Sequence, residues 1–386
     1  MIKSGIACVG CGACEQACAL GAVTLMPDDL GYLYPKVDSR KCVECGVCKS
    51  VCPLEAKDVP NSYPSCFAAR TKDEKLLAES SSGGVFSELA KPIIDHGGCV
   101  FGCALIQCEA LIVKAETMQE LALMRGSKYV QACVGTAFKD CKDELERGRR
   151  VLFSGTPCQI AGLKSFLKRD YENLLMLALI CHGVASPRVM KDYLRDVAQR
   201  NGMTIQSISF RDKRARPGVI SVVISGEKDG ARRQLVESWD NVYMRAFLGA
   251  YSYRENCFSC KFRRGRSGAD IVIGDFWGIK NYSNEFSVEE GVSAVLLYSE
   301  KGIKAFEALQ VEKKEFAYGC IAKHNHNLEN DACPPALRNE FLAHVRQGGS
   351  LFDFFARLDY VPVWKRVLRL PGRAMRKAIR MARRRK

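Results

Sequence analysis

The stretch ACVGCGACEQAC, residues 7–18, has its cysteine spacing repeated by CVECGVCKSVCP, residues 42–53. Each stretch holds four cysteines, with gaps of two, two and three residues between them. Gaps of two let three thiolates of one loop converge on one cluster, and the fourth cysteine of such a run normally ligates the other cluster of a pair. The spacing therefore predicts two 4Fe–4S clusters. The expected ligands are Cys8, Cys11, Cys14 and Cys52 for the first, and Cys42, Cys45, Cys48 and Cys18 for the second.

Zinc and disulfide bonds are the alternatives for these eight cysteines. Zinc sites use paired CxxC groups, whereas these runs hold four cysteines each. Disulfide bonds form in oxidising compartments, and residues 1–13 show no signal peptide. Residues 1–60 are therefore expected to form an α+β, ferredoxin-like module with two clusters.

Composition points to a packed protein of two or three domains. The chain has 386 residues, of which 47% are hydrophobic, and its longest apolar run, residues 174–181, is too short to span a membrane. Twenty cysteines without a signal peptide favour metal binding in a reducing compartment. We therefore expect a cytoplasmic protein.

The net charge of +15 is concentrated near the C-terminus. Residues 361–386 hold eleven Lys or Arg and no acid, which leaves +4 for the rest of the chain, so no nucleic-acid partner is expected. In the basic tail, residues 346–386, apolar positions recur with helical period. Such a segment can lie on an anionic membrane surface, here the inner face, or bind an acidic partner; a disordered tail is the alternative.

Helix and strand patterns alternate after a linker expected at residues 61–79. Apolar periodicity predicts helices at residues 85–94, 136–146, 159–168, 187–199, 302–309 and 335–345. It predicts strands at residues 99–106, 150–153, 174–180, 269–274 and 292–298. The sequence pattern changes over residues 205–236. It predicts strands at residues 205–210, 219–225 and 232–236, and a turn joins the last two strands. Residues 80–345 are thus expected to form an α/β domain with a β-hairpin insertion.

Two of the remaining cysteines follow predicted strands, where ligands bind in α/β sheets. Cys158 lies in SGTPCQ, residues 154–159, and Cys181 lies in CHG, residues 181–183. Cys257 and Cys260 form a lone CxxC, a weak signal by itself. The motifs that accompany these cysteines are SSGG at 81–84, GSKY at 126–129 and ADIVIGDFWG at 269–278.

Together these motifs make residues 80–278 resemble the beta-subunit family of coenzyme F420 hydrogenases and dehydrogenases. The resemblance implies FAD and a further 4Fe–4S cluster in the α/β domain. It implies that the ligands of this third cluster are Cys158, Cys181, Cys257 and Cys260. Buried free thiols are the alternative, since cysteine is often buried without a metal.

A flavin pyrophosphate needs backbone amides and a cation around it. Gly83 and Gly84 are expected to open a helix whose N–H groups face the anion, although a simple helix cap explains them too. Lys128 is expected to supply the positive charge. The full set of expected cofactor-binding residues is Ser82, Gly83, Gly84, Ser127, Lys128, Tyr129, Ser154, Gly155 and Thr156.

His182 is the candidate catalytic residue, because it adjoins Cys181 and its ordinary pKa suits proton donation. A hydrogen bond to a cluster sulfur, or a structural role, is the alternative. The run RDKR at residues 211–214 is either a solvated loop or a binding site for an acidic substrate. Asp275 and Trp277 are either neighbours of a bound group or structural residues.

These features indicate an iron–sulfur flavoprotein oxidoreductase. Electrons would pass from the ferredoxin-type clusters through the third cluster to FAD and on to a hydride-accepting substrate, with a protein or small molecule as donor. The resemblance suggests coenzyme F420 as the substrate. The CHG segment is similar to bacterial relatives found near surface-polysaccharide genes, which suggests another compound. The alternatives are an electron-transfer subunit without its own substrate and a zinc protein without redox activity.

Overall fold

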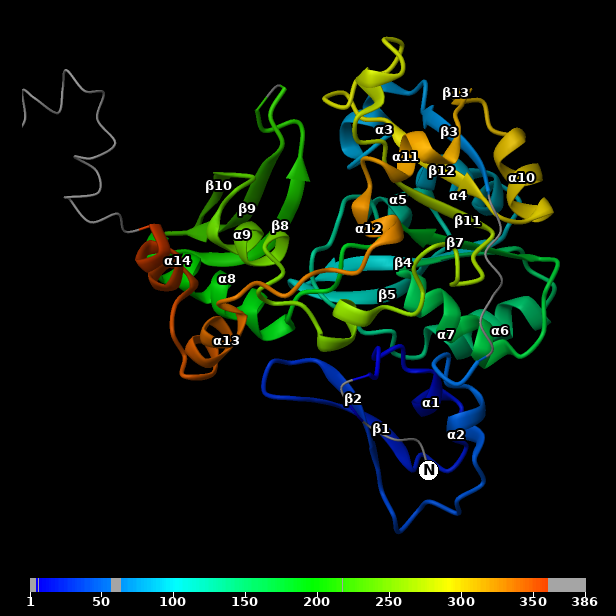
Figure 1. Ribbon diagram of the computed structural model, residues 1–386, viewed down its shortest axis with the longest axis horizontal. Coiled ribbons are helices and arrows are strands. Elements are labelled where there is room, and N and C mark those ends of the chain that lie inside the picture. The colour runs from blue at the N-terminus through cyan, green and yellow to red at the C-terminus, as the bar shows by residue number, and fades with distance from the viewer. Residues whose placement is uncertain (1–4, 6, 57–63, 217, 360–386) are drawn as a thin grey trace, which may run out of the picture.

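The computed structural model describes residues 5, 7–56, 64–216 and 218–359 of the chain (Figure 1). Three parts are visible: a small N-terminal module, a body built on a large sheet, and a smaller sheet with helices beside it. The described residues contain no helix with the length and apolar character required to cross a bilayer.

The N-terminal module is a β-hairpin with two one-turn helices. It contains α1 (Ala13–Gln16), β1 (Val23–Pro27), β2 (Leu33–Val37) and α2 (Val47–Ser50), and β1 pairs with β2 in antiparallel fashion. Both helices begin after a glycine in the left-handed region, Gly12 with φ 79° and Gly46 with φ 77°. Only glycine adopts this conformation without a steric cost, so the two equivalent glycines of the repeated sequence let each loop curl around its sulfurs.

The body is an eight-stranded mixed sheet with the order β13-β3-β12-β11-β7-β6-β4-β5. The central strands β4, β6, β7 and β11 are parallel, and antiparallel strands flank them on both sides. The strands are β3 (Ser65–Arg70), β4 (Cys99–Ile106), β5 (Glu109–Ala115), β6 (Val151–Gly155), β7 (Leu174–Leu179), β11 (Ile271–Asp275), β12 (Ser293–Leu297) and β13 (Glu312–Glu315).

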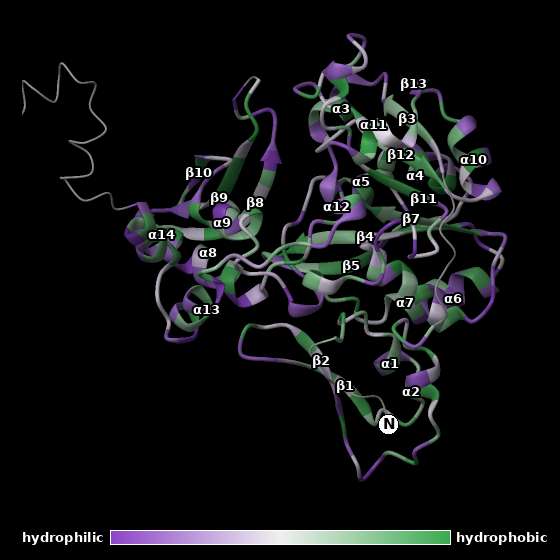
Figure 2. Ribbon diagram, viewed as in Figure 1, coloured by the Kyte–Doolittle hydropathy of each residue, from purple (hydrophilic) through white to green (hydrophobic). Residues whose placement is uncertain are grey.

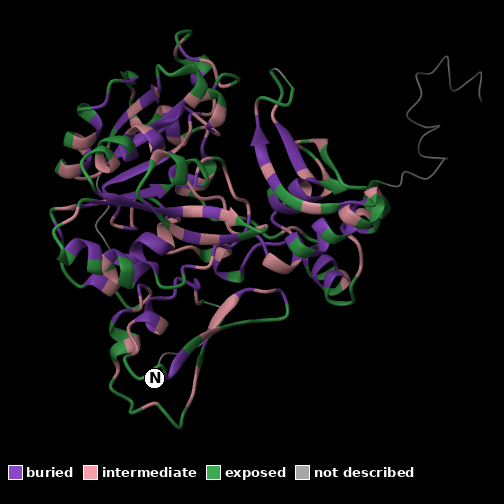
Figure 3. Ribbon diagram, turned by 180° about the vertical axis from the view of Figure 1, so that it is seen from behind, coloured by how far each residue is buried: buried purple, intermediate pink, exposed green. Residues whose placement is uncertain are grey.

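Helices cover both faces of this sheet because its central strands are apolar on both sides. In β6, Leu152 packs on the face covered by α4 (Val85–Asp95) and α10 (Glu300–Glu307), while Phe153 packs on the face covered by α6 (Ala137–Glu146) and α7 (Pro157–Leu167). Hydrophobic and buried residues accordingly concentrate in the strands (Figures 2 and 3). Short helices complete the body: α3 (Glu74–Glu79), α5 (Met118–Ala122), α11 (Tyr318–Ala322) and α12 (His326–Glu329).

The smaller sheet has the strand order β10-β9-β8. Its strands are β8 (Thr204–Asp212), β9 (Ser221–Lys228) and β10 (Ala231–Ser238), and the last two are joined through Asp229 and Gly230, both with positive φ. Such two-residue turns match the twist of a hairpin. The helices that accompany it are α8 (Pro187–Asn201), α9 (Val242–Leu248), α13 (Arg338–Arg346) and α14 (Leu351–Asp359).

The predicted helices and strands are present with small shifts of their ends, and the mixed α/β class is confirmed. Two expectations differ from the structure. The linker expected at residues 61–79 contains β3 and α3, and β3 lies inside the large sheet because its backbone pairs with β12 on one side and β13 on the other. The expected tail, residues 346–386, begins with folded structure in α14, whose Phe354 and Phe355 pack in the core; residues 360–386 lie outside the described residues.

The N-terminal module packs on helices α6 and α7. The Gln16 side chain accepts hydrogen bonds from the Phe138 and Lys139 N–H groups, at 2.9 and 3.1 Å, at the start of α6. In α7, Gly162 leaves room for the module: a Cβ atom there would lie 2.8 Å from Cys11 Cβ and 2.9 Å from Cys11 Sγ. This approach is closer than real Cβ contacts allow, so a side chain at position 162 would displace the first cysteine loop.

Replacing Gly162 with valine is therefore expected to loosen the module. Overpacking of this kind costs about 1–3 kcal/mol, and here the cost falls on the contact between α7 and Cys11. We expect faster backbone hydrogen exchange at residues 8–14 and loss of iron during anaerobic gel filtration. Ser165→Val, on the same helix, is the matched control. Equal exchange and equal iron retention in the two variants would contradict this account of the contact.

Candidate functional site

The first four-cysteine site lies inside the N-terminal module. Cys8, Cys11, Cys14 and Cys52 line one small cavity, which is the grouping expected from the crossed ligand pattern. Burial and the neighbouring cysteines raise the pKa of Cys14 to about 12, and burial raises the pKa of Cys11 well above its ordinary value. Because burial disfavours the ionised thiols of Cys11 and Cys14, a compensating cation is needed there, and four cysteines around one cavity fit a group that brings iron.

The other four cysteines of the module lie nearer the surface. Cys45 is exposed, whereas Cys18, Cys42 and Cys48 are half-buried. Cys18 Sγ accepts a hydrogen bond from the Ala22 N–H group at 3.2 Å. Desolvation raises the pKa of Cys18, but N–H groups of residues 20–23 outweigh it and lower the pKa overall. These N–H groups suit a thiolate, as expected for a ligand.

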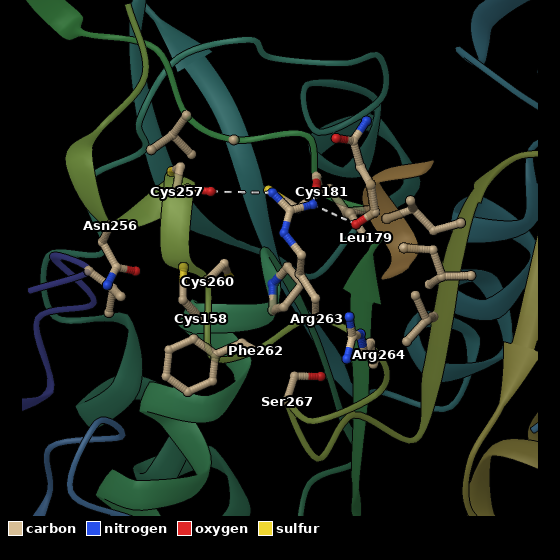
Figure 4. Close-up of a pocket in the computed structure, with 18 of the residues that line it drawn as sticks. Cys158, Leu179, Cys181, Asn256, Cys257, Cys260, Phe262, Arg263, Arg264 and Ser267 are labelled. Carbon is tan, nitrogen blue, oxygen red and sulfur yellow. Dashed lines mark hydrogen bonds between the residues drawn. The ribbon is translucent and has the colours of Figure 1, made fainter. Parts of the chain in front are cut away.

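A further group of four cysteines, called the second cysteine site below, lies where the body meets the N-terminal module (Figure 4). It is the expected site of the third cluster. Cys158, Cys181, Cys257 and Cys260 line one cavity, although they come from the start of α7, the end of β7 and the loop around the short helix η1 (Glu255–Ser259). Burial, followed by the nearby cysteines, raises the pKa of Cys158 and of Cys181 to about 12. The Thr156 hydroxyl lies 3.2 Å from Cys158 Sγ and opposes part of this shift. The four residues implied by the family resemblance are thus brought together.

No three His, Cys, Asp or Glu side chains in the described part of the chain group closely enough to hold a single metal ion. In a 4Fe–4S cluster each iron takes one thiolate, so the four sulfurs surround a larger group.

Arg263 joins the loops of this second site, with a side chain only 5% exposed. Its Nη1 donates to Cys181 O at 3.0 Å and to Asn327 O at 2.5 Å, and its Nη2 donates to Cys257 O at 3.4 Å (Figure 4). Asp331 pairs with its Nε at 3.3 Å. One guanidinium therefore fixes cysteine loops that are distant in the sequence.

Arg254 connects the second site with the N-terminal module and is 1% exposed. Its Nε donates to Cys8 O at 2.7 Å, its Nη2 to Leu33 O at 2.9 Å and its Nη1 to Gln131 Oε1 at 3.1 Å. The guanidinium lies 4.0 Å from the Tyr34 ring centroid. No carboxylate within the described residues pairs with it, so a buried positive charge lies beside both four-cysteine sites.

A third and larger cavity, of about 320 Å³, adjoins the second cysteine site. It lies at the carboxyl ends of β6, β7 and β11, and Trp239, next to the smaller sheet, lines its far wall. Of the nine expected cofactor-binding residues, it is lined by Ser82, Gly84, Ser127, Lys128, Tyr129, Ser154, Gly155 and Thr156, and His182 lines it as well. A cavity of this size with a few polar groups is typical of a small-molecule site.

Gly83 does not act as expected. Its N–H group donates to Ser293 Oγ at 3.0 Å, and a Cβ atom there would lie 2.2 Å from Ala69 O. Gly83 is therefore a close-packing residue between loop and sheet, not an anion-binding one. Gly84, with φ 80°, precedes α4, and the first turn of this helix lines the cavity. No side chain of the described residues caps α4, so its N-terminal start can bind an anion.

Lys128 is less available to an anion in the cavity than expected. Its Nζ donates to Met124 O at 2.7 Å and Arg125 O at 2.8 Å, and burial lowers its pKa to about 8. Tyr129 joins an aromatic group with Phe247 and Trp239, with ring centroids 4.6 and 5.7 Å away. Tyr129 therefore forms part of an aromatic wall.

His182 has a defined tautomer. Its Nδ1 lies 2.9 Å from the Asn327 side-chain nitrogen, which can only donate, so the neutral ring carries its proton on Nε2. Burial lowers the pKa of His182; Asp275 raises it, and Arg263 and Arg211 lower it. His182 is thus a neutral Nε2–H donor in the wall of the cavity.

Several residues of the site were missed by the sequence analysis or only partly identified. Asn327 and the two buried arginines carry no spacing signal, since their partners lie far away in the sequence. Arg211 belongs to β8 and not to a solvated loop: its Nη1 donates to Asp275 Oδ2 at 2.5 Å inside the cavity. The basic residues beside the CxxC, Arg254 and Arg263, are the one local signal that could have been followed.

Comparisons with known proteins agree with these features. Residues 148–318 match the family model for the C-terminal region of the coenzyme F420 hydrogenase/dehydrogenase beta subunit, and residues 7–56 match the model for a 4Fe-4S dicluster domain. The F subunit of F(420)H(2) dehydrogenase from Methanosarcina mazei is 27% identical over 223 residues, covering 50% of this chain. The chain spans 60% of the length of that relative.

Among solved structures, a chain of the F420-reducing NiFe hydrogenase complex from Methanosarcina barkeri aligns with a TM-score of 0.46 and 15% identity, covering 71% of this chain and 92% of that one. The resemblance seen in the motifs is confirmed by the two family models and the relative. The chain thus matches a 4Fe–4S dicluster domain at residues 7–56 and the C-terminal region of the coenzyme F420 hydrogenase/dehydrogenase beta subunit at residues 148–318.

Proposed function

We propose that this chain is an iron–sulfur flavoprotein oxidoreductase, in which electrons pass from ferredoxin-type clusters through a third cluster to FAD and on to a hydride-accepting substrate, coenzyme F420 or another compound. The observation that carries this proposal is the position of Val9, which lines all three cavities. Cys158 and Cys181 line both the second cysteine site and the large cavity. Three sites in direct succession suit electron transfer better than three separate structural sites.

The third cluster would be held by Cys158, Cys181, Cys257 and Cys260. A bound cluster supplies one-electron transfer. The chain's own residues prepare the site: Arg263 fixes two of the loops, and the start of α7 and the Thr156 hydroxyl favour the thiolate of Cys158.

FAD would occupy the large cavity, and when bound it exchanges single electrons with clusters and a hydride with a substrate. The start of α4 offers N–H groups to its phosphates, and Ser154 at the end of β6 offers a hydroxyl group. The aromatic wall around Tyr129 offers apolar surface to its ring. His182 presents an Nε2 proton, which suits it to donate to a bound ring or substrate.

An electron-transfer subunit without its own substrate is the second candidate. It is favoured by the name of the Methanosarcina mazei relative, which is one subunit of a dehydrogenase. A separate redox partner protein is compatible with either function. The basic segment, residues 361–386, lies outside the described residues, and its binding to an anionic membrane surface stays a prediction.

Anaerobic purification of the full chain tests the proposal. We expect a brown protein with about twelve irons per chain, as three cubane clusters require, and one FAD. Reduced protein should then be reoxidised by its substrate, for which coenzyme F420 is the first compound to test. A colourless zinc protein would contradict both candidates, and full cofactor content without reoxidation by any small molecule would favour the electron-transfer subunit.

A further inference from the structure

One buried cation in the large cavity has an unused hydrogen-bond donor. Arg211 lies on β8, its side chain is 5% exposed, and it lines the cavity. Its Nη1 donates to Asp275, but its buried Nε has no partner in the described structure. Leaving such a buried donor unpaired is unfavourable, and an acceptor bound in the cavity would offset this cost.

Two indoles flank this arginine. The guanidinium carbon lies 5.9 Å from the ring centroid of Trp239 and 5.7 Å from that of Trp277, and both tryptophans line the cavity. They come from different sheets: Trp239 follows β10 of the smaller sheet, and Trp277 follows β11 of the large one. The tryptophans are half-buried, so part of their surface remains open to a ligand.

The charges of this corner are nearly balanced. Asp275 is 18% exposed and neutralises Arg211, while burial raises the pKa of Tyr129 and the charge of Arg211 opposes that shift. The ion pair with Asp275 leaves the Nε–H group of Arg211 as a donor beside the indoles of Trp239 and Trp277. A guanidinium donor suits an oxyanion, and indoles suit a planar conjugated ring.

We propose that Arg211, held by Asp275 between Trp239 and Trp277, binds an oxyanion, a carboxylate or phosphate, of a planar conjugated ligand. This inference rests on the proposed function, because that function places both a flavin and its substrate in this cavity. The oxyanion belongs either to the substrate or to the flavin cofactor. The Arg211 guanidinium would bind either one through the same charged hydrogen bond. His182 lines the same cavity.

The test compares wild type with Arg211→Met. Arg214→Met is the matched control, since Arg214 is 60% exposed and pairs only locally with Asp212. The probes are anthraquinone-2-sulfonate and neutral 2-(hydroxymethyl)anthraquinone, whose binding to purified anaerobic protein is measured by calorimetry. Flavin content is measured on the same samples. Because Arg211→Met leaves Asp275 buried and unpaired, the double variant Arg211→Met, Asp275→Asn is included to keep the charge balanced.

If the oxyanion belongs to the substrate, wild type prefers the sulfonate by about tenfold or more, as a charged hydrogen bond predicts, and both Arg211 variants lose this preference but keep their flavin. If it belongs to the cofactor, both Arg211 variants lose more than half of the flavin and Arg214→Met does not. The inference is overturned if the Arg211 variants keep wild-type flavin content and wild-type relative binding of the two probes. Wild-type protein that contains no flavin would contradict the proposed function instead. The relative binding of the charged and neutral probes to wild type and the Arg211 variants would still decide the role of Arg211.

Discussion

Replacing Cys158 with alanine is expected to lower the iron content from about twelve to about eight atoms per chain, because a 4Fe–4S cluster needs four thiolates and alanine offers no ligand. Cys158 lies at the start of α7 and lines both the second cysteine site and the large cavity. Loss of the cluster proposed at the second cysteine site would remove the redox centre between the clusters of the N-terminal module and the large cavity. We expect the flavin of the variant to be reduced by an external donor at least a hundredfold more slowly.

Iron analysis and low-temperature electron paramagnetic resonance of reduced protein check this result. Cys257→Ala should give the same iron content and the same missing signal, since ligands of one cluster act as a unit. Cys133→Ala is the control, because Cys133 is half-buried like Cys158 but lines none of the three cavities. Iron that remains near twelve in Cys158→Ala would exclude Cys158 as a ligand.

The local spacing predicts that Cys8, Cys11 and Cys14 line one site, because a two-residue gap keeps sulfurs of one loop near each other. The grouping of Cys18 with Cys42, Cys45 and Cys48 stays a prediction. The structure gathers Cys52 with Cys8, Cys11 and Cys14 as expected. Cys158 and Cys181 could be placed at one edge of the sheet because they follow parallel strands. Cys257 and Cys260 could not be added by such reasoning, since the smaller sheet separates them from Cys181 in the sequence; only the family resemblance implied them.

The errors have a common physical cause, which is contact between residues distant in sequence. Gly83 has the local pattern of an anion-binding glycine, but its N–H group is taken by Ser293, 210 residues away. β3 has the short, broken pattern of a linker and becomes a strand because β12 and β13 pair with it. Arg211 has the pattern of a solvated turn and becomes buried because Asp275 of another sheet pairs with it.

Replacing Arg254 with methionine is expected to weaken the docking of the N-terminal module and to lower the reduction potentials of the neighbouring clusters. The arginine donates to carbonyl oxygens of Cys8 and Leu33 and to the side chain of Gln131. Methionine fills a similar volume but leaves these buried acceptors unpaired, at about 1–3 kcal/mol each. We therefore expect hydrogen exchange at residues 8–10 and 33 to accelerate by at least a hundredfold.

The potentials should fall because a buried positive charge stabilises the added electron. Arg254 lines the second cysteine site, where burial raises the pKa of Cys158 and the charge of Arg254 opposes that shift. At a separation of about 10 Å and an effective dielectric constant of about 20, two unit charges interact by about 1.7 kcal/mol, or about 70 mV for one electron. Redox titration followed by electron paramagnetic resonance should show a negative shift on the order of 50–100 mV.

Two further variants separate the charge of Arg254 from its geometry. Arg254→Lys keeps the positive charge but loses the guanidinium, whose three nitrogens donate to three separate acceptors. It should therefore retain the reduction potentials and still show faster backbone hydrogen exchange. Arg346→Met removes the exposed pair of Arg346 with Asp29, which also joins the N-terminal module to the rest of the chain but is worth at most about 1 kcal/mol. If Arg254→Met behaved like Arg346→Met in both measurements, Arg254 would be an ordinary packing residue. If only the potentials shifted, the hydrogen bonds of the guanidinium would be dispensable for docking. The positive charge beside the two cysteine sites would then explain why Arg254 is buried with no carboxylate partner among the described residues.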